Sequence, residues 1–211
     1  MIIKYQNIEL ESIKSHHIEQ IRNWRNLESI QNKMIYREYI TFDEQEIWFE
    51  DVVTKNKLFF ICKIDHEPIG LIYSDNIDWE QKISYNSGIF LIDNTIYGTG
   101  YPILISLLFT YCGFNFNLRE NIVKVLNDND NALQFNKLIG YVLKEEHPLY
   151  SIFSLKKNDF YNTISKFPND LKITDTVEFY FEKTEMDHFI QKILKEENIV
   201  LGSEFKIIFP D

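Results

Sequence analysis

The chain has 211 residues, of which 45% are hydrophobic and 15% aromatic, and its formal net charge at neutral pH is −10. This length suits one sizeable domain, or a domain of about 150 residues with an appendage. The apolar content excludes a disordered chain. The negative charge argues against a nucleic-acid partner or an anionic membrane surface, because both require a basic face. Any anionic ligand must therefore be held by local donors.

The sequence lacks the usual signals for a metal site or a membrane anchor. Cys62 and Cys112 each lie inside an apolar run and are expected to be buried free thiols. The adjacent residues His16 and His17 are expected in a solvated turn. The N-terminus does not have the shape of a signal peptide, and no apolar stretch reaches the roughly 18 residues of a membrane span. We expect a cytoplasmic protein without a metal.

The first part of the chain predicts a strand followed by two helices. Residues 8–13 alternate between apolar and polar, which is typical of a strand. Ser15 is expected to cap the first helix, whose apolar residues fall on one face: Ile18, Ile21 and Trp24. Thr41 and Glu44 form a capping box that opens the second helix. Its apolar side is expected to hold Trp48, Phe49, Val52 and Val53.

A hairpin and a central strand follow. Residues 58–64 predict a strong strand, residues 65–68 a turn, and residues 69–73 the returning strand. Residues 76–81 are expected to form a polar loop. Residues 84–92 then predict the central strand.

A glycine pair connects the central strand to an apolar run at residues 103–112, which predicts a buried helix. Gly98 and Gly100 would let the backbone turn tightly, and Pro102 suits the first helical turn. Free N–H groups and the helix dipole would then point at one place, which is an anion site. A tight connection without a ligand has the same pattern. The GxGxxG and P-loop motifs are absent.

The rest of the chain predicts a strand at 122–126, a helix that ends at Leu138 with Gly140 as a left-handed cap, and strands at 141–143 and 150–155. After Pro168, residues 176–181 predict a strand, Thr184 caps a helix, and residues 204–209 predict a last strand. This unit is too small to be stable alone. It should pack on the preceding domain or on a second subunit, in which case the protein would be a homodimer.

Over residues 5–160 this order resembles the GCN5-related N-acetyltransferase (GNAT) superfamily. The loop keeps both family glycines but has Thr95 at the Gln/Arg position. The closing family pattern falls on Asn129, Ala132, Asn136, Gly140 and Tyr141. The resemblance implies a mixed α/β fold with a central, mostly antiparallel, splayed sheet flanked by helices. It divides the chain into an acetyltransferase domain (1–160) and a C-terminal extension (161–211).

Residues 22–50 look most like the N-acetyltransferases that act on nucleotide-linked amino-deoxy sugars in nonulosonic (pseudaminic) acid and O-antigen pathways. That likeness implies that Met34 and Tyr36 contact the sugar nucleotide, and packing between the two helices is the alternative. Tyr73 is also predicted to bind substrate. Other acceptors are a different small amine or a protein N-terminus. A protein that binds acyl-CoA without turnover is a further alternative.

The resemblance also implies acetyl-CoA as the acetyl donor. Its pantetheine arm would pair as an added strand with the main chain of Phe90, Leu91 and Ile92, and Asn129 could bond to the same arm. The pyrophosphate would lie on the N–H groups of the glycine loop: Gly98, Thr99, Gly100 and Tyr101.

The predicted catalytic residues are Tyr85, Ser84 and Asn136. The amine must lose a proton, and a main-chain N–H near Leu91 would meet the charge that develops on the carbonyl oxygen. The family places a proton-donating tyrosine at position 136, and Asn136 cannot donate in that way. Tyr85, Ser84 or Tyr73 could serve instead, or solvent could protonate the thiolate. Three acids before the central strand are expected to be solvated: Asp75, Asp78 and Glu80.

Overall fold

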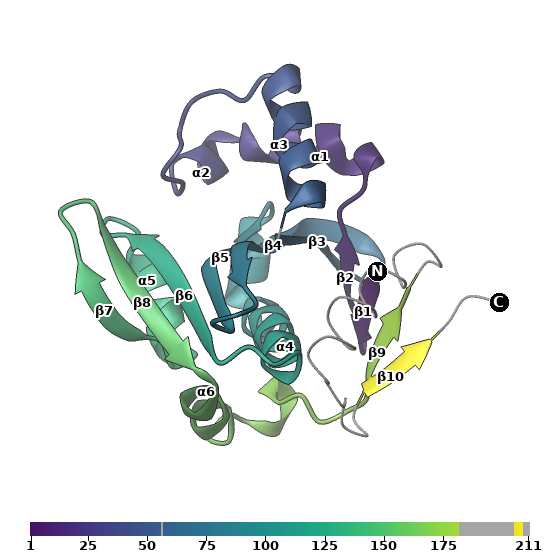
Figure 1. Cartoon of the computed structure of the whole chain (residues 1–211), viewed down its shortest axis with the longest axis vertical. Helices are drawn as coiled ribbons and strands as arrows, with labels where there is room; N and C mark the ends of the chain where they lie inside the picture. Colours follow the sequence, from purple (N-terminus) through teal and green to yellow (C-terminus); the bar gives the residue numbers. More distant parts are fainter. Residues whose placement is uncertain (56, 182–204, 209–211) are drawn as a thin grey trace.

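The computed structural model describes residues 1–55, 57–181 and 205–208, and these form one ten-stranded sheet with helices on both faces (Figure 1). The strand order is β10-β9-β1-β2-β3-β4-β5-β6-β8-β7. Neighbouring strands are antiparallel except β5–β6 and β9–β10, which are parallel. The sheet is therefore mostly antiparallel, as the sequence predicts.

The strands are β1 (Ile2–Tyr5), β2 (Ile8–Ser12), β3 (Leu58–Ile64), β4 (Glu67–Asp78), β5 (Ile83–Leu91), β6 (Glu120–Leu126), β7 (Val142–Glu146), β8 (Tyr150–Lys156), β9 (Val177–Tyr180) and β10 (Phe205–Ile208). The α-helices are α1 (Ile18–Arg25), α2 (Glu28–Gln31), α3 (Phe42–Thr54), α4 (Tyr101–Asn115), α5 (Asp130–Leu138) and α6 (Lys157–Ile164). Three short 3₁₀ helices complete the described elements: η1 (Ser15–His17), η2 (Asn94–Gly98) and η3 (Asn169–Leu171).

The two faces of the sheet carry separate cores. Figure 1 shows α1, α2 and α3 on one side of the sheet and α4 on the other. In β3, Phe59 and Ile61 pack in the core under α1–α3, whereas Phe60 and Cys62 pack in the core with α4. Because side chains alternate along a strand, a strand covered on both faces is apolar throughout. This explains the continuous apolar run of residues 58–62.

The helix α4 is buried on several sides, as its apolar run predicts. Leu104 and Leu108 pack in the core shared with β1–β3, and Leu107 and Phe114 pack in a third core formed with β6, β8 and α6. One helix therefore joins the two halves of the sheet. Its N-terminus, which follows the glycine loop, is fixed by this packing.

Several predicted elements are confirmed. Thr41 caps α3 by accepting a hydrogen bond from Glu44 N–H, and Glu44 accepts from Thr41 N–H in return. The strands predicted around residues 58–64, 84–92, 122–126 and 150–155 are present within a few residues. Gly140 has a φ of 102°, the left-handed conformation expected of a helix cap.

Other predictions are wrong. The strand β4 continues to Asp78, through the first half of the predicted polar loop, because it pairs with β5 from Gly70 to Asp78. Val53 is exposed rather than packed on the apolar side of α3. The strand β1 and the helix α6 have no counterpart in the predicted order, since each is short and completed by tertiary pairing.

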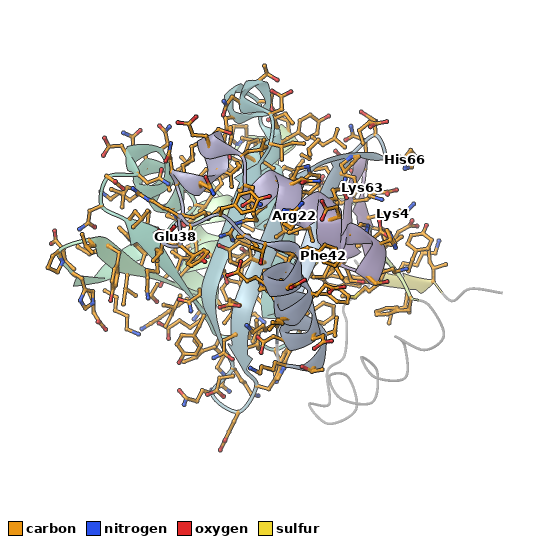
Figure 2. All side chains as sticks on the ribbon, turned by 90° about the horizontal axis from the view of Figure 1, so that it is seen from above. Lys4, Arg22, Glu38, Phe42, Lys63 and His66 are labelled. Atoms are coloured by element: carbon orange, nitrogen blue, oxygen red, sulfur yellow. The ribbon has the colours of Figure 1, made fainter. Side chains whose placement is uncertain are left out.

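The N-terminal helix begins differently from the prediction. Ser15 lies within η1 and makes no cap, since the preceding residue Lys14 has the N-cap position. His17 is buried, not solvated, and its Nδ1 accepts a hydrogen bond of 3.0 Å from Lys14 N–H. Burial lowers the pKa of His17 to about 4. Ion pairs surround this corner, including Lys63–Glu11 at 2.5 Å and Lys4–Glu9 at 2.8 Å (Figure 2).

The extension beyond residue 160 joins the same sheet in its described parts. The strand β9 pairs antiparallel with β1, and β10 lies parallel to β9. Phe179 and Phe205 pack in the core with α4. The predicted helix after Thr184 lies outside the described residues, so the boundary at residue 160 stays a prediction.

Cys62 and Cys112 are buried free thiols, and burial raises the pKa of both. Among the described residues, no helix has the length and apolarity that crossing a bilayer requires.

We predict that His17 makes folding sensitive to mild acid. In the unfolded chain His17 becomes protonated below its ordinary pKa of 6.5, whereas in the folded chain it becomes protonated only near pH 4. The free energy of unfolding should therefore fall as the pH drops through this window. In His17→Asn, which keeps an acceptor for Lys14 N–H, urea unfolding at pH 7 and pH 5 should differ less than in the wild type.

The matched control is Ser165→Ala, which removes an exposed hydroxyl that does not titrate and should keep the wild-type pH dependence. An unchanged pH dependence in His17→Asn would show that His17 does not titrate in this way.

Candidate functional site

The strands β5 and β6 separate, and the site forms where they part. They pair only from Ile83 to Tyr85 on β5, and the last pair joins Tyr85 to Ile122. Beyond it the six remaining residues of β5 have no partner on β6. A splayed pair of parallel strands therefore leaves one edge of β5 open in the middle of the sheet.

A chain of buried side-chain hydrogen bonds lies at the vertex of the splay. Asn86 has a φ of 52°, which interrupts the alternation of side chains along β5. Ser84 and Ser87 can thus meet, with 2.8 Å between their hydroxyl oxygens. Ser87 donates to Asn121 Oδ1 on β6 at 2.7 Å. Asn121 also bonds to the side chain of Tyr141, which links the vertex to the end of α5.

A single cavity of about 1020 Å³ extends from this vertex to both sides of the sheet. It is bounded by the loop after α2, by β4 and β5, by the start of α4, and by β6 and α5. Such a volume is at the upper end of the range for ligand pockets and suits two ligands that meet. Among the residues predicted from the sequence, the cavity brings together Met34, Tyr36, Tyr73, Phe90, Leu91, Thr99, Asn129 and Asn136.

The open edge of β5 is only partly available. Ile92 N–H donates to Ile69 O at 2.9 Å, so this residue faces β4, and the prediction that it pairs with a pantetheine arm is wrong. The alternation of the backbone then turns Leu91 and Ile89 toward the splay, and Phe90 away from it. Leu91 N–H donates to the hydroxyl of Tyr97 at 3.0 Å. The main chain of Ile89 is therefore the free part of the edge.

The N–H groups of the glycine loop are also partly used. Thr99 N–H donates to Ile96 O at 3.0 Å, and Tyr101 N–H donates to Thr99 Oγ1 at 3.3 Å, so both are corrected as phosphate donors. Within the described part of the chain, the N–H groups of Gly100 and Ile103 make no hydrogen bond. These two groups, at the start of a 15-residue helix, form the anion site that the geometry supports.

The predicted tight turn does not explain why glycine occupies positions 98 and 100. Neither has a positive φ, and Gly100 has an ordinary helical conformation. A side chain at Gly100 would lie 2.9 Å from Leu171 Cδ2, whereas nothing lies within 4 Å of the same position at Gly98. Gly100 thus makes room for η3, and Gly98 leaves open space in front of the loop.

On the opposite face of the sheet, Arg25 and Tyr73 enter the cavity. Tyr73 stacks on Phe59 at 5.0 Å, and a side chain at Gly88 would lie 2.7 Å from the Tyr73 hydroxyl. Burial raises the pKa of Tyr73, so its hydroxyl stays protonated at neutral pH. Arg25 Nε is buried without a hydrogen-bond partner, and burial lowers the pKa of the guanidinium.

The loop that carries Met34 and Tyr36 is fixed at its far end. Asn26 exchanges two hydrogen bonds of 2.8 Å with the backbone of Ile40. Arg22 donates to the hydroxyl of Tyr39 at 2.9 Å, and Figure 2 shows Arg22 beside the start of α3. The rim of the cavity is therefore held in place on this side.

The charges that line the cavity have one sign. Arg25, Lys33 and Lys124 contribute to the wall, and none of the described lining residues is an Asp, Glu or His. Lys33 lies over the ring of Tyr97 at 5.1 Å, and Lys124 over the ring of Tyr150 at 4.6 Å. No carboxylate among the described residues pairs with these three cations. The cavity is thus locally positive in a protein with a net charge of −10.

The predicted catalytic residues do not form a catalytic group. Ser84 is buried and Tyr85 does not line the cavity, although Ser84 touches Ser87, which does. Asn136 donates to Ala132 O at 2.8 Å and is thus bound to its own helix. Asn129 caps α5 through its Oδ1, so its predicted contact with a ligand could come only from the amide nitrogen. The catalytic roles of Ser84, Tyr85 and Asn136 stay predictions.

The three acids before the central strand lie outside the cavity. Asp75 accepts a hydrogen bond from Lys57 at 2.9 Å, and Asp78 accepts from Gln81 N–H at 2.8 Å. Asp75, Asp78 and Glu80 all lie off the cavity, as expected.

Sequence reasoning missed four residues that shape the site: Arg25, Ser87, Tyr97 and Tyr141. Arg25 is the last residue of α1, and its local sequence does not show that its side chain enters a cavity. Ser87 and Tyr141 gain their roles from the separation of β5 and β6, which no local pattern reveals. Tyr97 lies inside the predicted glycine loop. A large side chain next to small residues is the feature of the sequence that could have indicated its role.

One cluster outside the cavity has the residue types of a metal site. Ligand atoms of Glu11, His16 and His17 lie within 4.8 Å of one another. Lys63 already occupies Glu11 at 2.5 Å, and Lys14 N–H occupies His17 Nδ1. The second histidine nitrogen then carries the proton, so His17 has no lone pair ready for a metal. The geometry suits ion pairing better than metal binding.

Comparison with known proteins supports the fold. No protein-family model matches the chain, and no curated protein sequence does. A spermidine N-acetyltransferase from Vibrio cholerae, in complex with CoA and spermine, is 16% identical with a TM-score of 0.66, covering 75% of this chain and 100% of its own. The ribosomal L7/L12 alpha-N-protein acetyltransferase RimL, in complex with coenzyme A, is 14% identical with a TM-score of 0.64, covering 74% and 98%.

The N-acetyltransferase PseH of Campylobacter jejuni is 20% identical with a TM-score of 0.55, covering 72% of this chain and 99% of its own. At such identities the likeness establishes the fold. The chain has the GNAT fold of these acetyltransferases.

We predict that Asn121 stabilises the vertex. Replacing it in Asn121→Leu removes one partner from the Ser87 hydroxyl, which keeps Ser84, and one from the Tyr141 hydroxyl, which keeps Thr110, and should lower the free energy of unfolding by about 1–3 kcal/mol. Urea unfolding measures this change. Ser165→Ala removes an exposed hydroxyl bond and should stay within about 0.5 kcal/mol of wild type. Equal stability of the two variants would contradict the role of Asn121.

Proposed function

We propose that the chain is an acetyl-CoA-dependent N-acetyltransferase that acetylates the amino group of a nucleotide-linked (UDP or dTDP) amino-deoxy sugar. The observation that carries the choice of acceptor is the cavity wall with three cations and no acid among its described residues. The GNAT fold and the likeness of residues 22–50 to sugar-nucleotide acetyltransferases support the reaction class.

The residues present fit a coenzyme A molecule. The free main chain of Ile89 offers a donor and an acceptor to the amides of a pantetheine arm, in the manner of an added strand. The N–H groups of Gly100 and Ile103 would hold the pyrophosphate at the start of α4. Asn129 lines the same cavity, and its amide nitrogen would donate to the arm.

The opposite end of the cavity fits an anionic acceptor. Arg25 is a cation without an anionic partner among the described residues, and an isolated buried charge is costly unless a ligand pairs with it. Lys33 lines the same cavity from the loop that carries Met34 and Tyr36. A diphosphate would satisfy both cations, with bidentate bonds to the guanidinium. The net charge of the protein does not oppose this, because local charges dominate at short range.

A polyamine is a weaker candidate for the same site. The Vibrio cholerae structure contains spermine, which is a polycation. Selective binding of a polycation needs carboxylates, and the described wall of this cavity has none.

The chemistry that the site supports is direct transfer. Bound acetyl-CoA supplies the acetyl group as a thioester. A neutral amine attacks the carbonyl carbon, the carbon–sulfur bond breaks, and the proton lost by nitrogen balances the proton gained by sulfur. The protonated hydroxyl of Tyr73 can orient the acceptor. With no acid or histidine among the described lining residues, water accepts the amine proton.

A small non-nucleotide amine and a protein N-terminus remain alternative acceptors. A non-catalytic acyl-CoA-binding protein is the alternative of another class, and the hydrogen bond of Tyr97 to Leu91 favours it, because that bond covers part of the strand edge.

We predict that acetyl-CoA raises the melting temperature of the protein and that a UDP- or dTDP-linked amino sugar raises it further. Release of free thiol from acetyl-CoA should be fastest with the nucleotide-linked amine in a panel that includes spermidine and an N-terminal peptide. A thermal shift with acetyl-CoA but no thiol release with any amine would favour the non-catalytic alternative. No shift with acetyl-CoA would refute the proposal.

We also predict that Arg25 selects the anionic acceptor. Arg25→Met removes the charge but keeps the apolar stem, and should raise the KM for the nucleotide sugar about tenfold or more, the loss expected for one charge-assisted contact. The KM for acetyl-CoA should not change. Arg37→Met, which changes an exposed arginine outside the cavity, serves as the control. An equal KM in Arg25→Met and wild type would contradict this assignment.

A further inference from the structure

Tyr97 occupies the edge of β5 as a neighbouring strand would. Its side chain reaches back from η2, and its hydroxyl lies 3.0 Å from Leu91 N and 3.5 Å from Leu91 O. A single phenol oxygen thus lies against both main-chain groups of one residue. A strand, or an amide of an added ligand, would bond to the same two groups.

The contact is built so that it can be released. The Tyr97 side chain is 43% exposed, and η2 is a single 3₁₀ segment of five residues capped by Asp93. The space in front of Gly98, the next residue, is open. Burial at the hydroxyl end raises the pKa of Tyr97, so the group stays neutral and its bond is an ordinary one. Such a bond contributes little net free energy, because water or a ligand can replace it.

We propose that Tyr97 is an internal competitor for the strand edge, which the pantetheine arm of an acyl-CoA must displace before it binds. This inference rests on the proposed function. The hydroxyl holds the Leu91 groups satisfied while the site has no ligand, which avoids an unpaired buried N–H. The ligand then exchanges one hydrogen bond for another, and its affinity is lower by the strength of the bond to Tyr97.

The displacement reaches the acceptor end of the cavity through Lys33. The ammonium of Lys33 lies over the Tyr97 ring at 5.1 Å, on the loop that carries Met34 and Tyr36. Movement of the ring would release this cation for an anionic acceptor. Acyl-CoA should therefore bind first and raise the affinity for the second substrate, and the coupling must be reciprocal.

The test compares coenzyme A binding to wild type and Tyr97→Phe by calorimetry. The variant keeps the ring but loses the hydroxyl, so coenzyme A should bind roughly three- to tenfold more tightly, the range for one net hydrogen bond. The melting temperature without ligand should fall slightly. A merely structural role for Tyr97 would weaken binding, so tighter binding with lower stability separates the two roles.

Tyr180→Phe is the matched control, because it removes a tyrosine hydroxyl bonded at 2.7 Å to Glu178 on β9, far along the sheet from β5. Its affinity for coenzyme A should equal that of wild type. Equal or weaker binding by Tyr97→Phe overturns the inference and leaves the proposed function in place. Failure of both wild type and Tyr97→Phe to bind coenzyme A overturns the proposed function together with the inference.

The coupling to Lys33 has its own readout. The affinity for UDP, used as the probe, should rise in wild type when coenzyme A is present. In Tyr97→Leu, which also removes the ring, this dependence should disappear. The same dependence in variant and wild type would refute the coupling.

Discussion

The hydrogen bond from Ser87 to Asn121 holds β5 and β6 together at the point where their backbones stop pairing. Everything in the site follows from this separation. The backbone alone would leave the two strands free to close or to split further. Because Asn121 also bonds to Tyr141, the vertex is tied to the end of α5 and to the helix α4 beneath it. The cavity is therefore a fixed opening in the sheet.

The distribution of charge gives the opening its chemical character. The protein as a whole is acidic, but every charged side chain among the described residues of the cavity wall is a cation. Acidic residues close in sequence to the lining residues pair with other groups outside the cavity, as Asp75 does with Lys57. Arg25 is half-buried and its Nε is buried, and partial exclusion of water strengthens any interaction that it makes with an anion. Charge selection in this cavity depends on a few side chains.

Local rules account for the parts of the fold that could be predicted. The capping box at Thr41 and the left-handed Gly140 depend on neighbours within a few residues, and both are present. The apolar run before Cys112 can only be a buried element. Contacts between distant segments decided the rest. Nothing in the sequence near Asn86 shows that its backbone would bring Ser84 and Ser87 together, and no local pattern shows that the hydroxyl of Tyr97 would reach Leu91.

The contact between Gly100 and Leu171 connects η3, which precedes β9 in the chain, to the start of α4. The segment behind Leu171 is anchored by the fully buried Tyr5, whose hydroxyl accepts from Thr174 N–H and donates to Lys172 O. The segment around residues 171–174 thus supports the backbone that would face a diphosphate. Its sequence is constrained by the shape of that loop, and insertions near residue 171 would disturb the ligand end of the molecule before they disturbed the sheet.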